Sequence, residues 1–342
     1  MTVGRLNVPV LFFFAAALLC FSFSAGAAVE PGATRILPWA NGAKACFLLM
    51  FDDSWPSHIS VAVPELEKRH LPATFYICPG KGEYRVFHDA WETNLWRHGA
   101  VYGNHTMTHK GVADLADARR EIGGCTEEIL RIIPGKRPRL ISWAMPGVEQ
   151  GKWNISSDEL SALLGEYHLV DRPPFKGHGA VYHMQTAEQM LALADKAIAD
   201  GGMEYVIFHG LEIKDPNRGY QDFWAMKQDV VFPFFDGIAA RRDRGDLWVT
   251  DHISYHKYAT EKETAKIESL VCTPREIKFL LSCQADPQFY DEPVTLETAV
   301  PQDWRAVSVR QGAALQKVKP LNGTVRYRAL PGKEPVILAP QE

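Results

Sequence analysis

From about residue 43 to residue 258, short apolar runs alternate with segments of helical periodicity, and this alternation constrains the fold more than any other feature of the sequence. Continuous apolar runs are typical of strands buried on both faces, and repeated strand–helix units build parallel sheets covered by helices. The expected strands are residues 45–51, 73–78, 140–144, 168–171, 205–208 and 247–250, and the expected helices are residues 57–70, 115–132, 157–164, 186–199 and 229–242. The class is therefore α/β, whether the sheet stays open and doubly wound or closes into a barrel.

The pattern changes after Thr260, where short segments of alternating polarity replace the strand–helix units. Proline, glycine and asparagine separate these segments, as is typical of a small all-β sandwich. The expected strands are residues 266–272, 277–283, 294–300, 306–310, 324–329 and 336–339. We therefore expect an α/β domain at residues 40–260 and a C-terminal β-sandwich at residues 264–342.

The first 27 residues have the pattern of a signal peptide. Arg5 supplies a positive charge, residues 8–23 are almost entirely apolar, and small residues at 24–28 offer cleavage after Ala27. The apolar stretch is short for a membrane span. We expect export to the periplasm or the exterior, with no stable membrane span after cleavage; an uncleaved anchor is the alternative.

Composition excludes some classes of partner. Of the 342 residues, 46% are hydrophobic, which is ample for a large core, and the net charge is −4. Because no basic run is present, the sequence does not indicate a nucleic-acid partner or an anionic membrane. No pattern reports the oligomeric state.

Acidic and histidine residues stand where strands are expected to end. Asp52 and Asp53 follow the apolar run 45–51, and His209 follows the run 205–208. The carboxyl ends of parallel strands share one face, where the catalytic groups of barrel-like α/β folds collect. A histidine there can act as general acid near neutral pH, although a lone histidine beside an apolar strand is more often a packed core residue.

His105 and His109 have a spacing that suits two ligands of one metal ion. The flanking Gly103-Asn104 and Lys110-Gly111 favour a loop or an irregular helical turn. Two histidines and one carboxylate can form the protein half of a Zn²⁺ site, with open positions for water and substrate. Fe²⁺, Co²⁺ and Ni²⁺ accept the same ligands, so the sequence does not fix the metal. The alternative is a pair of unrelated surface histidines.

Four segments together resemble the polysaccharide deacetylase family (NodB homology domain, carbohydrate esterase type). They are Phe51-Asp52-Asp53-Ser54, Pro72-Ala73-Thr74-Phe75-Tyr76, Gly103-Asn104-His105-Thr106-Met107-Thr108-His109 and Val206-Ile207-Phe208-His209-Gly210. Their order and approximate spacing match the family over about residues 43–258, and only the combination is specific. The resemblance implies an irregular (β/α) barrel of the NodB homology type, a divalent metal that is most often Zn²⁺, and hydrolysis of N-acetyl or sometimes O-acetyl groups on a carbohydrate.

The resemblance also implies a role for each residue of the site. Asp53, His105 and His109 would be the metal ligands, Asp52 the general base and His209 the general acid. Water activated by the metal would attack the acetyl carbonyl, without a covalent enzyme intermediate.

The sequence departs from the family where an Arg-x-Pro motif is expected. The motif falls at Ala144-Met145-Pro146, and the side chain of Ala144 cannot orient Asp52. Arg172 ends another expected strand, so we hypothesise that it supplies the missing cation from a neighbouring strand. The alternative is a loop arginine paired with Asp171.

Pro146, Trp143 and His252 are further candidates for substrate contacts or for orienting the site. Four tryptophans are candidates for an aromatic platform under a sugar ring: Trp143, Trp153, Trp224 and Trp248. The alternative is that they are core residues, as tryptophan commonly is, above all Trp248 on an expected strand. His252 follows the last expected strand of the α/β part, which makes it a candidate for the pocket lining.

We therefore expect an exported, metal-dependent hydrolase that removes N-acetyl groups from an acetylated carbohydrate. One alternative is an acetyl esterase that uses the same residues on O-acetylated glycans. Another is a carbohydrate-binding protein on an inactive deacetylase scaffold, against which the complete set of acids and histidines argues. Hydrolysis of an amide outside carbohydrates is a further possibility.

Overall fold

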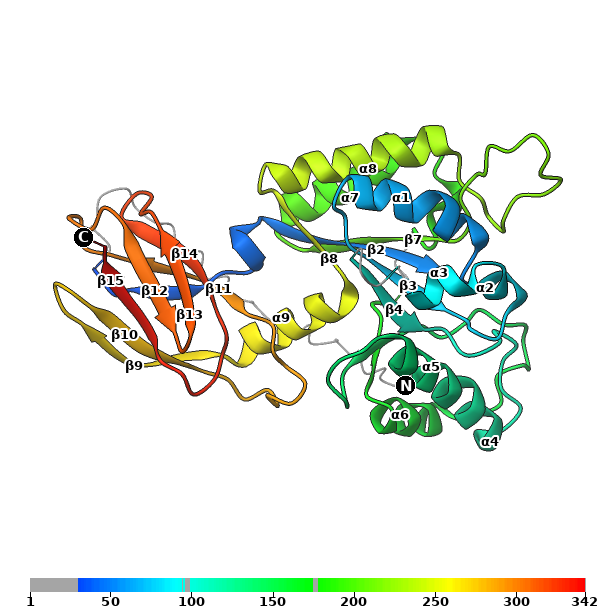
Figure 1. The fold of residues 1–342 in the computed structure, drawn as a ribbon, viewed down its shortest axis with the longest axis horizontal. Coiled ribbons are helices and arrows are strands. Elements are labelled where there is room, and N and C mark those ends of the chain that lie inside the picture. Colours follow the sequence, from blue (N-terminus) through cyan, green and yellow to red (C-terminus); the bar gives the residue numbers. More distant parts are fainter. Residues whose placement is uncertain (1–29, 94, 96–98, 175–177, 342) are drawn as a thin grey trace, which may run out of the picture.

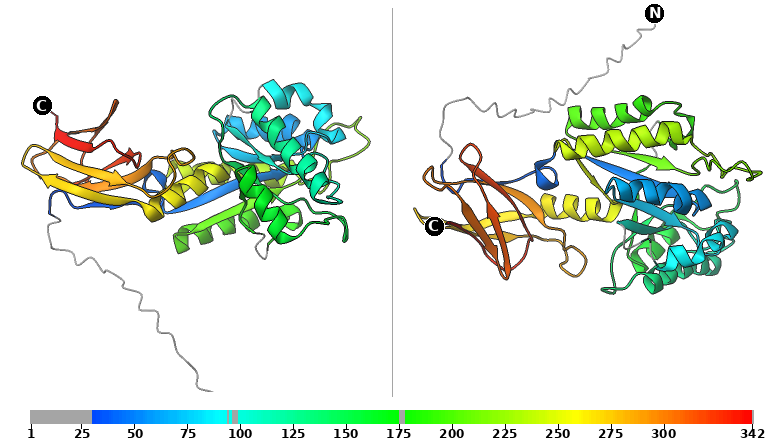
Figure 2. Two further views of the ribbon diagram at one scale, coloured as in Figure 1. Left: turned by 90° about the horizontal axis from the view of Figure 1, so that it is seen from below. Right: turned by 45° about the horizontal axis from the view of Figure 1, so that its top comes forward.

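The computed structural model describes residues 30–93, 95, 99–174 and 178–341, and the expected signal peptide lies outside them. An α/β part and an all-β part lie side by side along the longest axis of the molecule (Figure 1; Figure 2). Within the described ranges, no helix combines the length and the apolar character needed to span a bilayer.

The α/β part is built on one seven-stranded sheet in which every pair of strands is parallel. Its strands are β2 (Ala45–Asp52), β3 (Ala73–Ile77), β4 (Ala100–Asn104), β5 (Ile141–Trp143), β6 (Leu169–Asp171), β7 (Met203–Phe208) and β8 (Leu247–Thr250). Every residue of β2 is buried, which explains its continuous apolar sequence.

Strand β2 pairs with three other strands of this sheet. β7 pairs with residues 46–51 of β2, while β8 pairs with residues 45–48 and β3 with residues 50–52. A strand has two edges, so β8 and β3 share the edge opposite β7 at successive positions. The sheet is therefore an irregular, curled half-barrel, which confirms the expected fold class.

Helices connect the strands and cover the sheet. They are α1 (Val63–Lys68), α2 (Gly82–Val86), α3 (His88–Thr93), α4 (Leu115–Ala118), α5 (Gly124–Ile132), α6 (Ser157–Glu166), α7 (Ala187–Asp200), α8 (Gln228–Asp243) and α9 (His252–Thr264). In Figure 1, α1, α7 and α8 lie above the sheet, and α4, α5 and α6 lie below it.

Local sequence signals explain where the clearest helix begins and ends. Thr186 and Gln189 form a capping box at the start of α7, so that each side chain satisfies a backbone N–H of the other residue. Gly201 follows the helix in the left-handed conformation, at φ 67°, which an L side chain adopts only with strain. Both signals were readable in the sequence, and the expected range 186–199 lies close to the observed one.

The all-β part contains two antiparallel sheets that enclose their own core. One sheet has the order β1-β11-β14 and the other the order β13-β12-β15-β10-β9. The strands are β1 (Thr34–Ile36), β9 (Lys266–Cys272), β10 (Ile277–Ser282), β11 (Val294–Ala299), β12 (Val307–Gln311), β13 (Ala314–Val318), β14 (Thr324–Ala329) and β15 (Val336–Pro340). The sandwich predicted for this region is confirmed.

Two of these strands were not predicted. β1 lies before the α/β part in the chain and pairs with β11, so the sandwich also uses residues from outside the expected range 264–342. Its three residues are too few to show an alternation. β13 is exposed along most of its length and therefore lacks the apolar face by which a strand is recognised. The expected domain boundaries stay predictions.

Helix α9, which was also not predicted, runs from the α/β part to the sandwich. Asp251 caps it by accepting hydrogen bonds from the backbone N–H groups of Ile253, at 2.9 Å, and Ser254, at 3.0 Å. Tyr258 of this helix is fully buried in the core of the sandwich. The helix therefore shares a hydrophobic core with the all-β part (Figure 1).

Glu261 of α9 is a buried carboxyl group at this junction. Its side chain is 1% exposed, and Oε2 accepts a hydrogen bond from the backbone N–H of Glu292 at 3.1 Å. Burial raises the pKa of Glu261 to about 7, from an ordinary value of 4.5, despite that hydrogen bond. A carboxyl whose pKa is raised by folding stabilises the fold fully below the unfolded pKa, and that contribution disappears as pH rises through the folded pKa.

We therefore predict that Glu261→Gln raises the melting temperature relative to wild type at pH 8, because the amide stays neutral and keeps its acceptor oxygen. At pH 4.5 the difference should vanish, since the wild-type carboxyl is then protonated. Thermal unfolding at both pH values tests this, with the exposed Glu263→Gln on the same helix as the control. Equal melting temperatures for Glu261→Gln and wild type at pH 8 would contradict the prediction.

Candidate active site

The turn after β2 brings two adjacent carboxylates to one pocket. Neighbouring side chains of a strand point to opposite faces, so Asp52 and Asp53 would diverge if the strand continued. Asp53 and Ser54 instead have φ angles of 81° and 60°, in the left-handed region that non-glycine residues rarely adopt. The Oγ of Ser54 accepts the backbone N–H of Cys78 at 2.8 Å, which ties this turn to the end of β3. Strained backbone held by its surroundings is typical of functional sites.

His105 and His109 follow β4 on an irregular loop rather than on a helix. Thr106 and His109 have φ angles of 65° and 59°, and the loop is fastened by Glu121, whose carboxylate accepts hydrogen bonds from the backbone N–H and the hydroxyl of Thr108, both at 2.8 Å. The two imidazoles therefore face one point because of the loop conformation, and the spacing expected from the sequence is realised without a helical turn.

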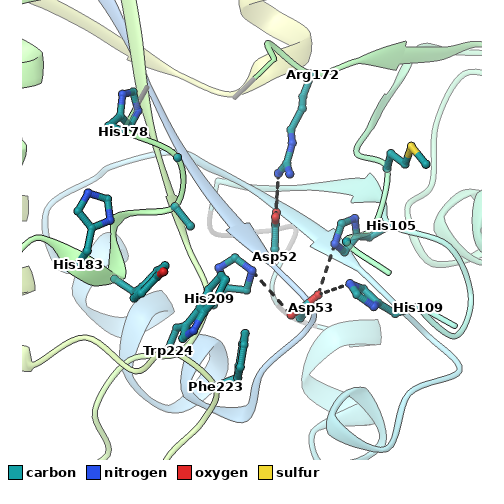
Figure 3. Close-up of a pocket in the computed structure, with 15 residues that line it drawn as sticks. Asp52, Asp53, His105, His109, Arg172, His178, His183, His209, Phe223 and Trp224 are labelled. Atoms are coloured by element: carbon teal, nitrogen blue, oxygen red, sulfur yellow. Dashed lines mark hydrogen bonds and ion pairs between the residues drawn. The ribbon is translucent and has the colours of Figure 1, made fainter. Parts of the chain in front are cut away.

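Asp53, His105 and His109 form a cluster with the geometry of a metal site. Asp53 Oδ1 lies 3.4 Å from Nε2 of His105 and 3.0 Å from Nε2 of His109, and one ligand atom from each residue lies within 4.8 Å of the others (Figure 3). Asp53 Oδ1 is buried without a hydrogen-bond partner among the described residues. A buried carboxylate oxygen facing two imidazole nitrogens fits a divalent cation.

The groups behind this cluster orient its ligands. Nδ1 of His105 donates to the backbone carbonyl of Ala144 at 2.7 Å, so Nε2 carries the lone pair that faces the cluster. The indole N–H of Trp55 donates to Oδ2 of Asp53 at 3.2 Å. Ala144, which stands where the family has an arginine, thus orients His105 through its backbone carbonyl.

The general-base candidate is held by the arginine that was proposed from the sequence. Nη1 of Arg172 donates to Oδ1 of Asp52 at 2.7 Å and to Oδ2 at 2.9 Å, and both side chains are buried (Figure 3). Burial alone would raise the pKa of Asp52, but Arg172, with His105 and His209, lowers it below its ordinary value. Asp52 is therefore an ionised carboxylate inside the protein.

The ring of Tyr76 packs against the guanidinium group of Arg172. The guanidinium carbon lies 5.0 Å from the centre of the Tyr76 ring, within the range of a cation–π contact. Gly103 makes room for this ring, because a Cβ at that position would stand 2.5 Å from Cδ1 of Tyr76. The glycine of the histidine segment thus has a packing role under the ion pair.

His209 follows β7 and lies across the cluster from His109. Its Nε2 is 4.0 Å from Oδ2 of Asp53, and its ring packs edge-on against Trp224 with the ring centres 4.8 Å apart. Burial lowers the pKa of His209, although Asp52 and Asp53 oppose that shift. His209 is therefore a packed histidine that nevertheless opens onto the pocket.

One pocket of about 560 Å³, within the usual range for small-ligand sites, contains these groups. Asp52, Asp53, His105, His109, Arg172 and His209 all line it. Tyr182 and Phe223, which the sequence did not single out, also line it together with Trp224. Tyr182 lies in a three-residue 3-10 helix and Phe223 in a turn. Neither segment is long enough to show a periodicity, so nothing in the sequence distinguished these two residues from solvent-facing ones.

The other candidates lie elsewhere. Trp143 is 1% exposed in the hydrophobic core, and the alternation of β5 turns Ser142 to the opposite face. There the Oγ of Ser142 lies 2.7 Å from Nδ1 of His252, which is itself buried. Pro146 is buried between Met145 and Gly147, which line the pocket. Among the described residues, Trp143, Pro146 and His252 are not part of the pocket lining.

Residues 40–162 match the family model described as polysaccharide deacetylase, which confirms the resemblance for the first three of its four segments. A gellan lyase from a Bacillus species is 20% identical over 346 residues, which cover 91% of this chain and 13% of the lyase. The chain thus spans about an eighth of the length of this relative.

Three solved structures show weaker similarity. The family 4 carbohydrate esterase from Streptomyces lividans, in complex with acetate, is 16% identical, with a TM-score of 0.40 over 60% of this chain and 91% of that chain. A polysaccharide deacetylase from Bacillus cereus is 14% identical, with a TM-score of 0.37 over 60% of this chain and 91% of that chain. A mutant of a CE4 family pseudoenzyme with restored enzymatic activity is 15% identical, with a TM-score of 0.41 over 60% of this chain and 65% of that chain.

The cluster predicts metal binding that depends on its own residues. Asp53→Ala and His109→Ala should each weaken Zn²⁺ binding at least about 100-fold, since even changes in groups behind metal ligands cost about 10- to 100-fold. Titration of metal-stripped protein with Zn²⁺ measures this. His183→Ala, a pocket histidine outside the cluster, is the control and should bind Zn²⁺ as wild type does. Equal affinity in Asp53→Ala and wild type would exclude this cluster as the metal site.

Proposed function

We propose that this chain, whose residues 40–162 match the polysaccharide deacetylase family, is a metal-dependent hydrolase that removes N-acetyl groups from a carbohydrate. The observation that carries the proposal is a buried, ionised Asp52, held by Arg172, beside the cluster of Asp53, His105 and His109. A base and a metal site in one pocket are the parts that hydrolysis by activated water requires.

Asp53, His105 and His109 would hold the metal. A bound divalent cation supplies Lewis acidity and lowers the pKa of a water ligand. Zn²⁺ is the first choice because one carboxylate and two imidazoles suit its preference for four ligands and leave open positions. Fe²⁺, Co²⁺ and Ni²⁺ fit the same donors.

The remaining residues move protons and fix geometry. Asp52 accepts the proton of the attacking water, and Arg172 keeps this carboxylate ionised and aimed through its contacts with both oxygens. A C–O bond forms at the acetyl carbon as the C–N bond breaks, and His209 passes a proton to the departing amine nitrogen. Acetate and the free amine leave, with water as the second reactant.

An acetyl esterase acting on O-acetylated glycans would use the same residues, since only the leaving atom changes from nitrogen to oxygen. Acetate release from matched N-acetylated and O-acetylated glycans separates the two reactions. Faster release from the N-acetylated member supports the proposal, whereas release from the O-acetylated member alone favours the esterase. Metal-replete protein that releases no acetate from either set would favour an inactive, carbohydrate-binding scaffold.

Export belongs to the same proposal, because polymeric glycans are reached outside the cytoplasm. The support is the pattern of residues 1–27, with its positive start, apolar run and small residues near Ala27. Sequencing the N-terminus of the protein recovered from its native compartment tests the cleavage. A mature chain that begins at Ala28 is expected, and an intact N-terminus in the cytoplasm would contradict it.

Because Asp52 is the proposed base and Arg172 only holds it, the two substitutions should lower kcat by different amounts. Asp52→Asn should lower kcat by about 1,000-fold, within the range for loss of a general base, while the Zn²⁺ content stays unchanged. Arg172→Ala should lower kcat by about 100-fold, because Asp52 remains but is neither fixed in place nor kept ionised by a neighbouring cation. Acetate release measures both, and Arg120→Ala, a surface arginine, is the control. Unchanged turnover in Arg172→Ala would contradict the role given to Arg172.

A further inference from the structure

A row of buried hydrogen bonds, here called the His252 network, joins His252 to the aromatic ring that packs against Arg172. Nδ1 of His252 lies 2.7 Å from the Oγ of Ser142, and the Ser142 hydroxyl donates to the hydroxyl of Tyr76 at 2.8 Å. The Tyr76 hydroxyl in turn donates to Sδ of Met50 at 3.4 Å. None of these four side chains is more than 2% exposed, so water does not compete for the contacts.

The donors of the His252 network all point in one direction. The hydroxyl proton of Tyr76 is used on Met50, and that of Ser142 is used on Tyr76. The remaining contact therefore takes its proton from Nδ1 of His252. Burial lowers the pKa of His252 to about 3, so the imidazole is neutral and its single N–H is the one that Ser142 accepts. Each hydroxyl of the network thus donates one hydrogen bond and accepts another.

The ring of Tyr76 connects this network to the proposed base. The guanidinium carbon of Arg172 lies 5.0 Å from the centre of the ring, and Nη1 of Arg172 contacts both oxygens of Asp52. Ser142 and Met50 hold the hydroxyl at the far end of the same ring. Because this end is fixed, the ring offers its face to the guanidinium group in one place.

His252 is itself fixed by its backbone. It is the first residue of α9, after the capping residue Asp251, and its N–H donates to the Oγ1 of Thr74 at 3.0 Å. Thr74 lies on β3, two residues before Tyr76. The histidine and the tyrosine are therefore tied to the same strand. Since the contact with Thr74 uses only the backbone of His252, replacing the imidazole leaves this contact in place.

We propose that His252 is a positioning residue for the hydrolytic reaction. Through Ser142 and Tyr76 it fixes the guanidinium group of Arg172, which in turn aims Asp52 at the attacking water. Among the described residues, His252 is not part of the pocket lining, so it acts on the base and not on the substrate. This inference rests on the proposed function, because Asp52 is a base only in that reaction.

Kinetics of acetate release test this role. His252→Ala lowers kcat about tenfold, the lower end of the range for groups behind functional residues, and leaves KM and the Zn²⁺ content unchanged. His252→Asn recovers most of the turnover, since its amide nitrogen stands as many bonds from Cβ as Nδ1 does. His256→Ala, on the next turn of α9 and in contact with Tyr290, is the control and keeps the wild-type kcat. A wild-type kcat in His252→Ala overturns the inference.

A double variant shows whether the effect passes through Tyr76. Tyr76→Phe keeps the ring but removes the hydroxyl, so it interrupts the His252 network without emptying the core. Alone it lowers kcat about as much as His252→Ala does, and adding His252→Ala to it costs almost nothing further. Losses that multiply to about 100-fold would mean that His252 affects turnover by another route, which also overturns the inference.

A spectroscopic readout decides the question if the wild-type protein releases no acetate, a result that would overturn the proposed function. The hydrogen bonds to Asp52 slow the rotation of the Arg172 guanidinium group, so its N–H protons give separate NMR signals, assigned by their loss in Arg172→Ala. In His252→Ala these signals merge, and in His256→Ala they stay separate. Merged signals support the positioning of Arg172 even without turnover. Unchanged Arg172 signals in His252→Ala overturn the inference while leaving the proposed function standing.

Discussion

The buried contact between Arg172 and Asp52 is the interaction on which the rest of the site depends. An isolated carboxylate buried at the end of β2 would be costly, and its ordinary response would be to take up a proton. Arg172 directly follows β6, which is four strands away from β2 in the strand order. At about 4.8 Å per strand, a flat sheet would separate these strands by roughly 19 Å. The 2.7 Å contact therefore requires the curled sheet, which connects fold to chemistry.

The backbone does as much as the side chains in assembling the metal cluster. Left-handed conformations at Asp53 and His109 turn their side chains toward a common point, and the carbonyl of Ala144 fixes the ring of His105. This explains how the chain dispenses with an arginine at position 144. In this chain the arginine that contacts Asp52 follows β6, the neighbour of β5 in the sheet. Position 144, after β5, instead holds His105 through its backbone carbonyl.

Much of this arrangement was predictable from sequence, for identifiable reasons. Long buried strands such as β2 and capped helices such as α7 have strong local signals, and the acids and histidines stand at strand ends where a parallel sheet gathers them. Strands β1 and β13 were not predicted, because β1 is very short and β13 has no buried face. Trp143 was a candidate for the pocket but is a core residue. Tyr182 lines the pocket from a three-residue 3-10 helix, Val181–His183, which is too short to show a periodicity.

The central claim is that Arg172 acts through Asp52, and a double-mutant cycle on acetate release tests it most directly. If the two residues form one unit, adding Arg172→Ala to Asp52→Asn should cost almost nothing further, because the group that Arg172 positions is already gone. The account predicts a double variant with the turnover of Asp52→Asn alone. Losses that multiply, so that the double variant is about 100-fold slower than Asp52→Asn, would contradict it.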